Sequence, residues 1–452
     1  MIVPVGPETT LISNAMRAAL GLVAGPDTSA ARITNPDGSF ELYFAGKNIN
    51  NDTGTFRFHA ASDFSTVTND PMAPVLRPAS EQPNPGPIPN AAGGFDRDYA
   101  GGGTPFQCPG PGGKLLYFYH GENYTDPYCL TTYACCSIGW SGIGIAYWDT
   151  AQAKFVKDGQ IIGANLPNQW YGTAASPINL ITPPGIPSGM AFYNPTDGYL
   201  YLYYTDRTTN PEYAGAPWKC NSSNCITVAR ALATTVCANA GQGGLHTEWS
   251  KYYHGSFSSP ALNADGSGGE FSPLSPAPGG GQPTAIKLSN GVWVMAAVYL
   301  TGIIVRTSLD GIAWSARQWV VQRVPPPTPV AYYPYLYEAG PGTVGMTYTR
   351  VKRTAKGKTN WSFAELDLQM LQLLPTSTPT LTPTPLPCVG DCNDDREVGV
   401  DELLTMVSIA LDGADLALCT AGDANHDGQI TIDEIITAVA NMLYGCPPAG
   451  AR

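Results

Sequence analysis

The sequence has few charged residues and no long apolar run. Only 13% of its 452 residues are Asp, Glu, Lys or Arg, and the net charge is −12. A nucleic-acid-binding protein needs a basic surface, so this charge argues against that class. The longest apolar stretch, residues 291–305, is too short to span a membrane and contains Gly302. We therefore expect no nucleic-acid partner and no membrane span, and we interpret 291–305 as two strands.

The eleven cysteines form no paired CxxC zinc pattern and no CxxCH haem site. They fall into local groups, and the last group follows a segment rich in Thr and Pro. Such grouping is typical of disulfides that form outside the cytoplasm. The odd total leaves at least one thiol free or paired between chains, and the spacing leaves the connectivity open.

Glycine, proline and aromatic residues are abundant instead: 50 Gly, 41 Pro and 10% Phe, Trp and Tyr. This mix favours short strands joined by turns. Residues 1–374 contain five loose copies of a two-strand motif whose first strand follows a glycine. The copies are 38–45 with 56–62, 113–120 with 144–148, 198–204 with 226–231, 291–296 with 303–308, and 342–348 with 361–366.

A repeat of roughly 60 to 80 residues with several strands is typical of propeller blades. The strands are apolar almost throughout, which indicates burial on both faces. We predict an all-β fold, a five-bladed β-propeller over residues 1–374. A β-sandwich with long insertions is the alternative.

The turn at residues 308–314, Ser-Leu-Asp-Gly-Ile-Ala-Trp, resembles the Asp box of sialidase-type propellers but is one residue shorter. We expect Asp310 to accept hydrogen bonds from turn amides, Gly311 to take a positive φ, and Trp314 to pack between strands. This turn marks a blade and not a catalytic centre.

Residues 375–387 consist mainly of Pro and Thr and are predicted to be a linker. In the polyproline II conformation such a linker spans about 40 Å. Its threonines suit O-glycosylation. The remaining segment, 388–452, is predicted to be a separate small module.

That module contains an internal repeat with an offset of 32 residues, in which 390–405 aligns with 422–437. The second copy matches an EF-hand calcium loop, in which oxygens at alternating positions surround the ion. Its predicted ligands are Asp423, Asn425, Asp427, the carbonyl of Gln429, Thr431 and Glu434. The first copy offers Asp391, Asn393, Asp395, the carbonyl of Glu397, and Glu402. We predict two Ca²⁺ sites, the first weaker because Arg396 and Gly399 depart from the pattern.

Each loop runs directly into a predicted helix, and no helix precedes the first loop because the linker ends at Pro387. The apolar face predicted for each helix follows the 3.6-residue period. These faces are Val400, Leu403, Val407 and Leu411 in the first helix, and Ile432, Ile435 or Ile436, Val439 and Leu443 in the second.

A calcium loop followed by a helix, duplicated in tandem, resembles dockerin, the docking module of secreted polysaccharide-degrading systems. The resemblance implies an extracellular or cell-surface protein of bacterial type, with a cohesin-like or cell-surface partner bound through residues 388–446. Loop positions 10 and 11 are Val400-Asp401 and Ile432-Asp433 here, where cellulosomal dockerins often have small hydroxyl residues. The four cysteines are a further departure.

A five-bladed propeller joined to such a module resembles glycoside hydrolases of the arabinanase, xylosidase, fructosidase or sialidase type. The resemblance implies paired carboxylates around the central channel as base and acid. Asp96 and Asp98 are candidates for the base, Glu122 for the acid, and Asp206 is a further candidate. Trp170, Tyr171 and Trp218 are candidates for stacking on sugar rings.

Two departures weaken this match. Residues 30–35 lack the Asp expected in the first blade, and Gln282-Pro283 stands where these enzymes place a Glu near a Pro. Two interpretations remain open. The protein is a secreted enzyme that hydrolyses a polysaccharide or glycoconjugate, or it is a non-catalytic extracellular protein that binds glycan or protein.

Overall fold

The computed structural model describes most of the chain, apart from several loops and the linker. The described residues are 2–69, 73–78, 95–97, 99–123, 140–165, 190–214, 220, 225–264, 266–274, 281–300, 302–322, 330–353, 359–374, 388–393, 395, 397–411, 413–424 and 428–446. The chain divides into two compact units, Met1–Leu374 and Pro375–Arg452.

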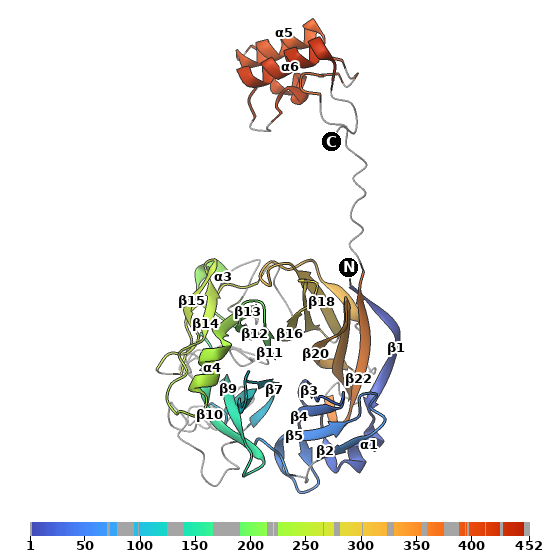
Figure 1. Ribbon diagram of the computed structural model, residues 1–452, viewed down its shortest axis with the longest axis vertical. Helices are drawn as coiled ribbons and strands as arrows, with labels where there is room; N and C mark the ends of the chain where they lie inside the picture. Colours follow the sequence, from blue (N-terminus) through green and yellow to red (C-terminus); the bar gives the residue numbers. More distant parts are fainter. Residues whose placement is uncertain are drawn as a thin grey trace, which may run out of the picture. The chain divides into compact units, whose positions relative to one another are not determined.

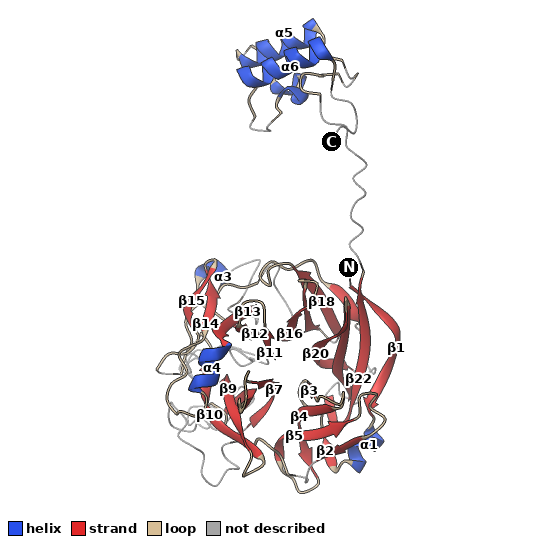
Figure 2. Cartoon of the chain, viewed as in Figure 1, coloured by secondary structure: helices blue, strands red, loops and turns tan. Residues whose placement is uncertain are grey.

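The first unit is built from five antiparallel sheets arranged around a common centre (Figure 1). One strand of each sheet lies nearest the centre, and these inner strands are β3, β7, β11, β16 and β20. Strands make up almost all of the regular structure in this unit (Figure 2). The fold is therefore a five-bladed β-propeller, as the sequence predicts.

Blades 1 to 3 are formed by consecutive strands. Blade 1 contains β2 (Leu22–Ala24), β3 (Ala31–Thr34), β4 (Phe40–Asn48), β5 (Thr53–Ala60) and β6 (Val67–Asn69). Blade 2 contains β7 (Tyr99–Gln107), β8 (Leu115–Asn123), β9 (Trp140–Asp149) and β10 (Lys154–Ile162). Blade 3 contains β11 (Met190–Asn194), β12 (Tyr199–Asp206), β13 (Cys225–Leu232), β14 (Ser250–Tyr253) and β15 (Ser256–Pro260).

Blades 4 and 5 complete the ring. Blade 4 contains β16 (Gly281–Lys287), β17 (Trp293–Tyr299), β18 (Gly302–Ser308) and β19 (Gln318–Val321). Blade 5 contains β20 (Val330–Gly340), β21 (Thr343–Arg353), β22 (Thr359–Leu373) and β1 (Ile2–Ile12). Among the residues that the structure describes, three short helices lie in the connections: α1 (Asn14–Ala19), α3 (Pro211–Ala214) and α4 (Ala233–Asn239).

The N-terminal strand closes the ring. β1 pairs with β22 from Ile2 opposite Leu373 to Ile12 opposite Leu366. The outermost strand of the last blade therefore comes from the start of the chain, and the hydrogen bonds of this pair join the two ends of the propeller.

Apolar side chains fill the spaces between blades. In β12 seven successive residues, from Leu200 to Asp206, are buried, so both faces of this strand lie inside the protein. Phe118 of blade 2 and Trp249 of blade 3 meet edge to face, with ring centroids 5.7 Å apart. Burial on both faces explains the near-continuous apolar runs in the sequence.

The turn at 308–314 has the expected structure. Oδ1 of Asp310 accepts hydrogen bonds from the amides of Ile312 and Ala313, both at 2.8 Å. Gly311 has φ +77°. The Trp314 ring is buried against Tyr203 of blade 3, with centroids 5.7 Å apart. The turn thus joins blade 4 to blade 3, and its predicted structural role is confirmed.

Four disulfides join the described cysteines. Cys108–Cys237 links the end of β7 to α4, and Cys220–Cys225 closes a short loop in blade 3. In the second unit the pairs are Cys388–Cys446 and Cys392–Cys419. Disulfides of this kind are typical of an oxidising compartment.

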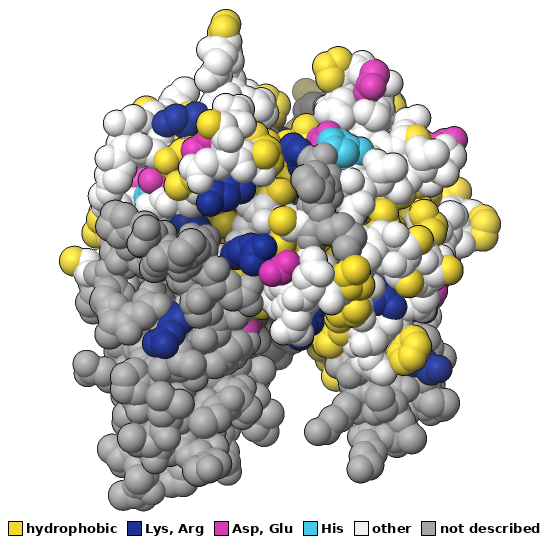
Figure 3. Space-filling model, turned by 90° about the horizontal axis from the view of Figure 1, so that it is seen from below, with side chains coloured by type: hydrophobic (Ala, Val, Ile, Leu, Met, Phe, Trp, Pro, Cys, Tyr) yellow, Lys and Arg dark blue, Asp and Glu magenta, His cyan; other side chains and the backbone are white. Residues whose placement is uncertain are grey.

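The composition predicts few surface charges. On the face drawn in Figure 3, the acidic and basic side chains of the described residues are dispersed among apolar and uncharged ones. Within the described residues, no helix is long and apolar enough to cross a membrane.

The second unit has two α-helices, α5 (Val400–Ala410) and α6 (Ile432–Tyr444), and two short 3₁₀ turns, Leu416–Leu418 and Thr420–Gly422. Its core is a cluster of small and medium apolar side chains: Cys388, Val398, Met406, Ile409, Cys419, Ile430 and Ala438.

The apolar helix faces named from the sequence are only partly buried. Val400, Leu411, Ile432 and Leu443 belong to these faces, yet each is more than 60% exposed. Met406, Ile409 and Ala438 fill the core instead. The small unit can bury only one narrow stripe per helix, so a second apolar stripe remains on the outside.

Candidate functional site

Asp27 lies where the first inner strand is interrupted, between β2 and β3. Its amide donates to the carbonyl of Ala45 in β4 at 2.8 Å, and the amide of Ala45 donates to Oγ1 of Thr28 at 2.8 Å. Gly25, two residues earlier, has φ +111°, and a Cβ there would lie 2.9 Å from Cα of Gly46. Only glycine fits this close approach. The segment is therefore firmly attached to β4, although its central residues belong to no strand.

Tyrosines from the neighbouring blades surround Asp27. The hydroxyl of Tyr333 in β20 donates to Oδ1 of Asp27 at 3.5 Å. The hydroxyl of Tyr99 in β7 donates to the backbone carbonyl of Asp27 at 3.3 Å. The amide of Tyr333 in turn donates to Oε1 of Gln282 in β16 at 2.9 Å. Four blades therefore contribute to the surroundings of one carboxyl group.

Irregularities in the inner strands produce this convergence. Gly102, Gln282 and Tyr333 all have positive φ values, of +59°, +54° and +55°. Each coincides with a shift in pairing register near the start of its strand. Bulges of this kind change the direction of a side chain and are common next to active sites. Positive φ at Gln282 and Tyr333 is a strained conformation for residues other than glycine.

Glu122 lies at the same end of the propeller. It stands near the end of β8, opposite Tyr99 at the start of β7. Its Oε1 is 2.7 Å from Nε2 of His120. The ring of His120 lies next to that of Tyr99, with centroids 5.9 Å apart. The same tyrosine therefore contacts Asp27 and the residues that position Glu122.

The charge of Glu122 acts on Asp27. Burial and, to a smaller extent, the negative charge of Glu122 raise the pKa of Asp27 to about 7, and the hydrogen bond from the Tyr333 hydroxyl opposes the shift. Both side chains keep partial exposure, which for Glu122 is 17%. Solvent therefore still reaches both carboxyl groups. We call Asp27 and Glu122 the carboxyl pair.

The tyrosines of the site remain protonated hydrogen-bond donors. Burial raises the pKa values of Tyr99 and Tyr333 well above 10, and the charge of Asp27 adds to this effect in both. At neutral pH the site thus contains two neutral hydroxyls directed at Asp27.

Asp96 packs against Gly121, the residue before Glu122, and forms a buried ion pair. Its Oδ2 is 2.5 Å from Nζ of Lys157 in β10 and accepts from the Tyr119 hydroxyl at 2.9 Å. Burial lowers the pKa of Lys157, and the charge of Asp96 opposes this. The Asp96 side chain is fully enclosed, which is typical of a carboxylate that joins two strands.

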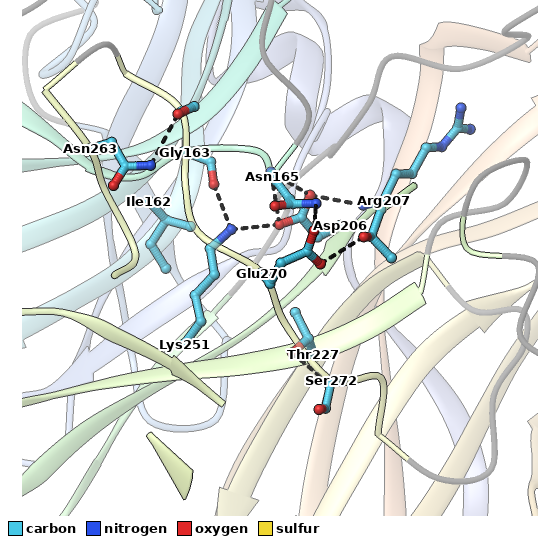
Figure 4. A network of polar contacts seen from close by, with 12 residues as sticks. Ile162, Gly163, Asn165, Asp206, Arg207, Thr227, Lys251, Asn263, Glu270 and Ser272 are labelled. Carbon is cyan, nitrogen blue, oxygen red and sulfur yellow. Dashed lines mark hydrogen bonds and ion pairs between the residues drawn. The ribbon is translucent and has the colours of Figure 1, made fainter. Parts of the chain in front are cut away.

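Asp206 is the centre of a second buried network (Figure 4). Its Oδ2 accepts from Nζ of Lys251 at 2.8 Å, and its Oδ1 accepts from the amides of Arg207 and Asn165 at 2.8 and 3.1 Å. Lys251 also donates to the carbonyl of Gly163 at 2.9 Å. The network therefore joins blade 3 to the end of blade 2.

Burial governs the chemistry of this network. Asp206 and Lys251 are both 0% exposed. Burial raises the pKa of Asp206, and the charge and hydrogen bond of Lys251 only partly oppose this. With its oxygens engaged by neighbouring groups, Asp206 has the surroundings of a structural carboxylate.

Several predicted site residues lie outside the described part of the chain. They are Asp98 among the catalytic candidates, Trp170, Tyr171 and Trp218 among the sugar-stacking candidates, and Asn425 and Asp427 among the calcium ligands. Of the catalytic candidates that the structure describes, it brings Glu122 next to a second carboxyl group at the site, whereas Asp96 and Asp206 each pair with a buried lysine.

Sequence analysis missed Asp27. An acidic residue was sought in residues 30–35, where none exists, although Asp27 precedes that segment by only a few positions. The available signal was Pro26, because a proline also stands near the start of the inner strands β16 and β20. A search for an acidic residue beside the proline of blade 1 would have found it.

The first predicted calcium loop is organised by Glu402. Its two oxygens accept from the amides of Cys392 and Gly399, both at 2.8 Å. The amide of Asp395 donates to Oδ1 of Asp391 at 3.1 Å and to Oδ1 of Asn393 at 2.9 Å. Asp391 and Glu402 are therefore buried in the loop, whereas Asp395 and Glu397 are exposed.

The second loop repeats this arrangement. The oxygens of Glu434 accept from the amides of Ala424 and Thr431, both at 2.8 Å, and Oδ2 of Asp423 accepts from the amide of Gly428 at 2.9 Å. The first and last acidic residues of both loops are at most 7% exposed: Asp391, Glu402, Asp423 and Glu434.

The donor set of these loops fits calcium. All described candidate ligands are oxygens, and two carboxylates per loop are buried close to the loop backbone. Residues 388–452 contain 12 acidic and 2 basic residues, whereas residues 1–387 contain 24 and 22. Nearly all of the net charge of the protein thus lies in the small unit. Buried carboxylates at this density are stabilised by a hard cation.

No protein-family model matches the chain, and no curated protein matches it. Solved structures with a similar arrangement include a family 117 glycoside hydrolase from the marine bacterium Zobellia galactanivorans. That match has 13% identity and a TM-score of 0.44, and it covers 80% of this chain and 89% of the other.

Two further solved structures are similar. An endo-arabinase from Bacteroides thetaiotaomicron matches with 10% identity and a TM-score of 0.41, over 79% of this chain and 98% of the other. A levansucrase variant from B. megaterium matches with 10% identity and a TM-score of 0.47, over 78% of this chain and 81% of the other.

Proposed function

We propose that the propeller hydrolyses glycosidic bonds and that the carboxyl pair is its catalytic centre. The observation that carries this proposal is the pKa of about 7 for Asp27, beside the charge of Glu122. Glycoside hydrolysis needs two carboxyl groups at one site, one protonated and one ionised at the working pH. A pKa of about 7 leaves Asp27 partly protonated at neutral pH, as the acid of such a pair requires.

Each group would have a defined task. The protonated carboxyl group donates its proton to the oxygen of the leaving sugar. The ionised one activates a water molecule or attacks the sugar carbon directly. Tyr99 and Tyr333 position Asp27, His120 positions Glu122, and Gln282 holds the backbone of Tyr333. Residues from four blades would thus set the geometry of the reaction.

The substrate class that we propose is a polysaccharide or glycoconjugate outside the cell. The resemblance of the chain to secreted glycan-degrading proteins supports this class. The four disulfides support an extracellular or cell-surface location.

For the small unit we propose two Ca²⁺ sites, with Asp391, Asn393, Asp395, Glu397 and Glu402 in the first. The second would use Asp423, Asn425, Asp427, Gln429, Thr431 and Glu434. A bound ion would offset the charge of the buried carboxylates and hold each loop against its helix.

We also propose that the small unit attaches the protein to a cohesin-like or cell-surface partner. Three large apolar side chains from each helix and its C-cap support this, since all six are more than 60% exposed: Val400, Leu404, Leu411, Ile432, Ile436 and Leu443. The last three follow the first three at the repeat offset of 32 residues. Exposed apolar stripes of this kind mark interaction surfaces.

The test of the hydrolase is a screen of the full chain on arabinan, xylan, fructan and sialylated substrates. We expect release of sugar from at least one of them, with loss of release in the variants Asp27→Asn and Glu122→Gln. The matched control is Asp63→Asn, which changes a carboxyl group in an exposed turn. If the protein binds one of these glycans but cleaves none, the non-catalytic interpretation replaces the hydrolase.

A further inference from the structure

A hollow of about 310 Å³ lies on blade 3, and the proposed reaction makes no use of it. Its walls come from β12, β13, β14, β15 and the start of α4, and they are lined by Tyr199, Arg230, Leu232, Thr235, Glu248 and Phe257, together with Ala231 and Ser250. The volume falls at the lower end of the range for small-molecule sites.

The hollow is remote from the carboxyl pair. It lies at the Tyr199 end of β12, whereas Asp206 at the other end lies near the start of the inner strand β11. The eight residues of β12 separate these ends by about 23 Å, at 3.3 Å per residue. A molecule bound in the hollow would therefore not occupy the proposed catalytic centre.

Arg230 is the positively charged group of the hollow, and its neighbours hold it in place. Its guanidinium carbon lies 4.2 Å from the ring centroid of Tyr199 and 4.1 Å from that of Phe257. Nη1 donates to the hydroxyl of Tyr201 at 3.4 Å, and that hydroxyl donates to Asp197 at 2.7 Å. When the planar faces of a guanidinium pack against rings, its N–H groups, which lie in the plane, can still donate hydrogen bonds at its edge.

No carboxylate among the described residues forms an ion pair with Arg230. The acidic residue of the hollow, Glu248, is engaged elsewhere: its Oε1 lies 2.9 Å from Nδ1 of His246. The hollow is therefore lined by a cation that two rings hold in place and by a carboxylate, Glu248, that also contacts His246.

These groups define the chemistry of a ligand. The guanidinium edge matches a carboxylate, with which it forms two parallel hydrogen bonds. Glu248, Ser250 and Thr235 offer partners for hydroxyl groups, and Leu232 and the rings offer apolar contact. The nearby charge of Glu248 disfavours a ligand with two negative charges. A hydroxyl-rich molecule with a single carboxylate satisfies all of these conditions.

We propose that this hollow binds a hexuronic acid residue of an acidic glycan, at a site separate from the carboxyl pair. Such a site would hold the protein on an acidic polysaccharide, whichever bond the propeller cleaves. The proposal does not depend on the proposed hydrolase, because binding here requires neither Asp27 nor Glu122.

The test is calorimetry of the full chain with three trisaccharides: galacturonic acid, neutral galactose, and sulfated galactose. We expect the galacturonic acid trisaccharide to bind at least tenfold more tightly than the other two. Arg230→Gln and Arg230→Lys should each weaken its binding at least tenfold, because lysine keeps the charge but not the planar edge.

The matched control is Arg317→Gln, which removes a guanidinium 4.4 Å from the ring of Tyr299 in blade 4 and should leave binding unchanged. Thr235→Trp provides a second test if the Arg230 variants unfold, since it fills the hollow from an exposed position on α4 and should abolish binding. Equal binding of the acidic and neutral trisaccharides, preference for the sulfated one, or unchanged binding in Thr235→Trp would overturn the proposal.

Discussion

The hydroxyl of Tyr333 donates to Oδ1 of Asp27 at 3.5 Å, although 306 positions separate the two residues in the chain. Tyr333 belongs to the inner strand of the last blade and Asp27 to the interrupted inner strand of the first. The two blades become neighbours only when the ring closes through β1 and β22. The same closure that completes the fold therefore completes the surroundings of the carboxyl pair.

Asp27 should make the propeller less stable at high pH. Folding raises its pKa from 3.8 to about 7, so the folded state binds the proton more tightly than the unfolded chain does. The contribution is fully present below pH 3.8 and is lost as the pH rises through 7. Asp27→Asn should therefore be more stable than the parent at pH 8, by up to about 4 kcal/mol, and equally stable at pH 4.

Urea denaturation at both pH values measures this difference. The exposed Asp63 is the control, because hydrogen bonds from Ser65 lower its pKa. Asp63→Asn should give no gain in stability at pH 8. A constant difference between Asp27→Asn and the parent from pH 4 to 8 would contradict the raised pKa.

In its protonated form, His246 should stabilise the packing of blade 2 against blade 3. Burial alone lowers its pKa, but the contacts with Asp158 and Glu248 outweigh burial and raise it to about 9. The stabilisation is full below pH 6.5 and is lost as the pH rises through 9. His246→Gln should cost about 3 kcal/mol in the free energy of unfolding at pH 7 and much less at pH 10.

The comparison for this variant is His59→Gln, which removes a partly exposed imidazole beside Glu41. It should cost less than about 1 kcal/mol at either pH. A loss of stability in His246→Gln that is the same at pH 7 and pH 10 would show that the histidine acts through packing and not through charge.

Removing only one partner of the Asp206–Lys251 ion pair should lower the free energy of unfolding. Lys251→Met leaves a buried carboxylate without its cation, which destabilises a protein by about 3 to 5 kcal/mol. Lys251→Met combined with Asp206→Asn should recover part of that loss, because the second change removes the buried charge. Lys154→Met, at an exposed position of β10, should have little effect. If the double variant were no more stable than Lys251→Met, the charge of Asp206 would not be the cause.

Calcium should protect the small unit and not the propeller. We expect EGTA to speed proteolysis within residues 388–446 while residues 1–374 keep their unfolding midpoint, because metal binding stabilises only the segment that holds the ligands. Titration with Ca²⁺ should show two sites. Glu434→Gln should remove the tighter site and Glu402→Gln the weaker one.

Asp433→Asn is the control for these variants, since it changes the exposed neighbour of Glu434. The disulfides Cys388–Cys446 and Cys392–Cys419 also hold this unit together, so the proteolysis is repeated under reduction. The same rate of proteolysis with and without calcium under both conditions would count against the two sites.

The second and third strands of every blade were predictable from the sequence, and the inner and outer strands were not. The predicted pairs coincide with β4–β5, β8–β9, β12–β13, β17–β18 and β21–β22. These strands are regular and apolar. The inner strand β7, in contrast, contains Gly101 to Gly103 and Pro105 and shifts its register. The pairing of β1 with β22 joins opposite ends of the chain and leaves no local pattern.

The residues of the candidate site were also only partly predictable from the sequence. Glu122 was recognisable because it stands at the end of a regular strand, next to His120. Asp27 was missed because it lies between two short strands, and its importance comes from Tyr99 and Tyr333, which are distant in sequence. The exposed stripe on α5 and α6 could not be told from a core face, because helical periodicity shows which residues share a face and not which face is buried.

The central claim is that Asp27 and Glu122 act together in cleaving a glycosidic bond, and the kinetics of single and double variants test it most directly. On the glycan identified by the screen, we expect kcat/KM to fall at least about a thousandfold in Asp27→Asn and in Glu122→Gln. The double variant should be no more than a few-fold worse than either, because groups that act as a unit are not additive. A single variant that keeps more than a tenth of the parent activity would contradict the claim.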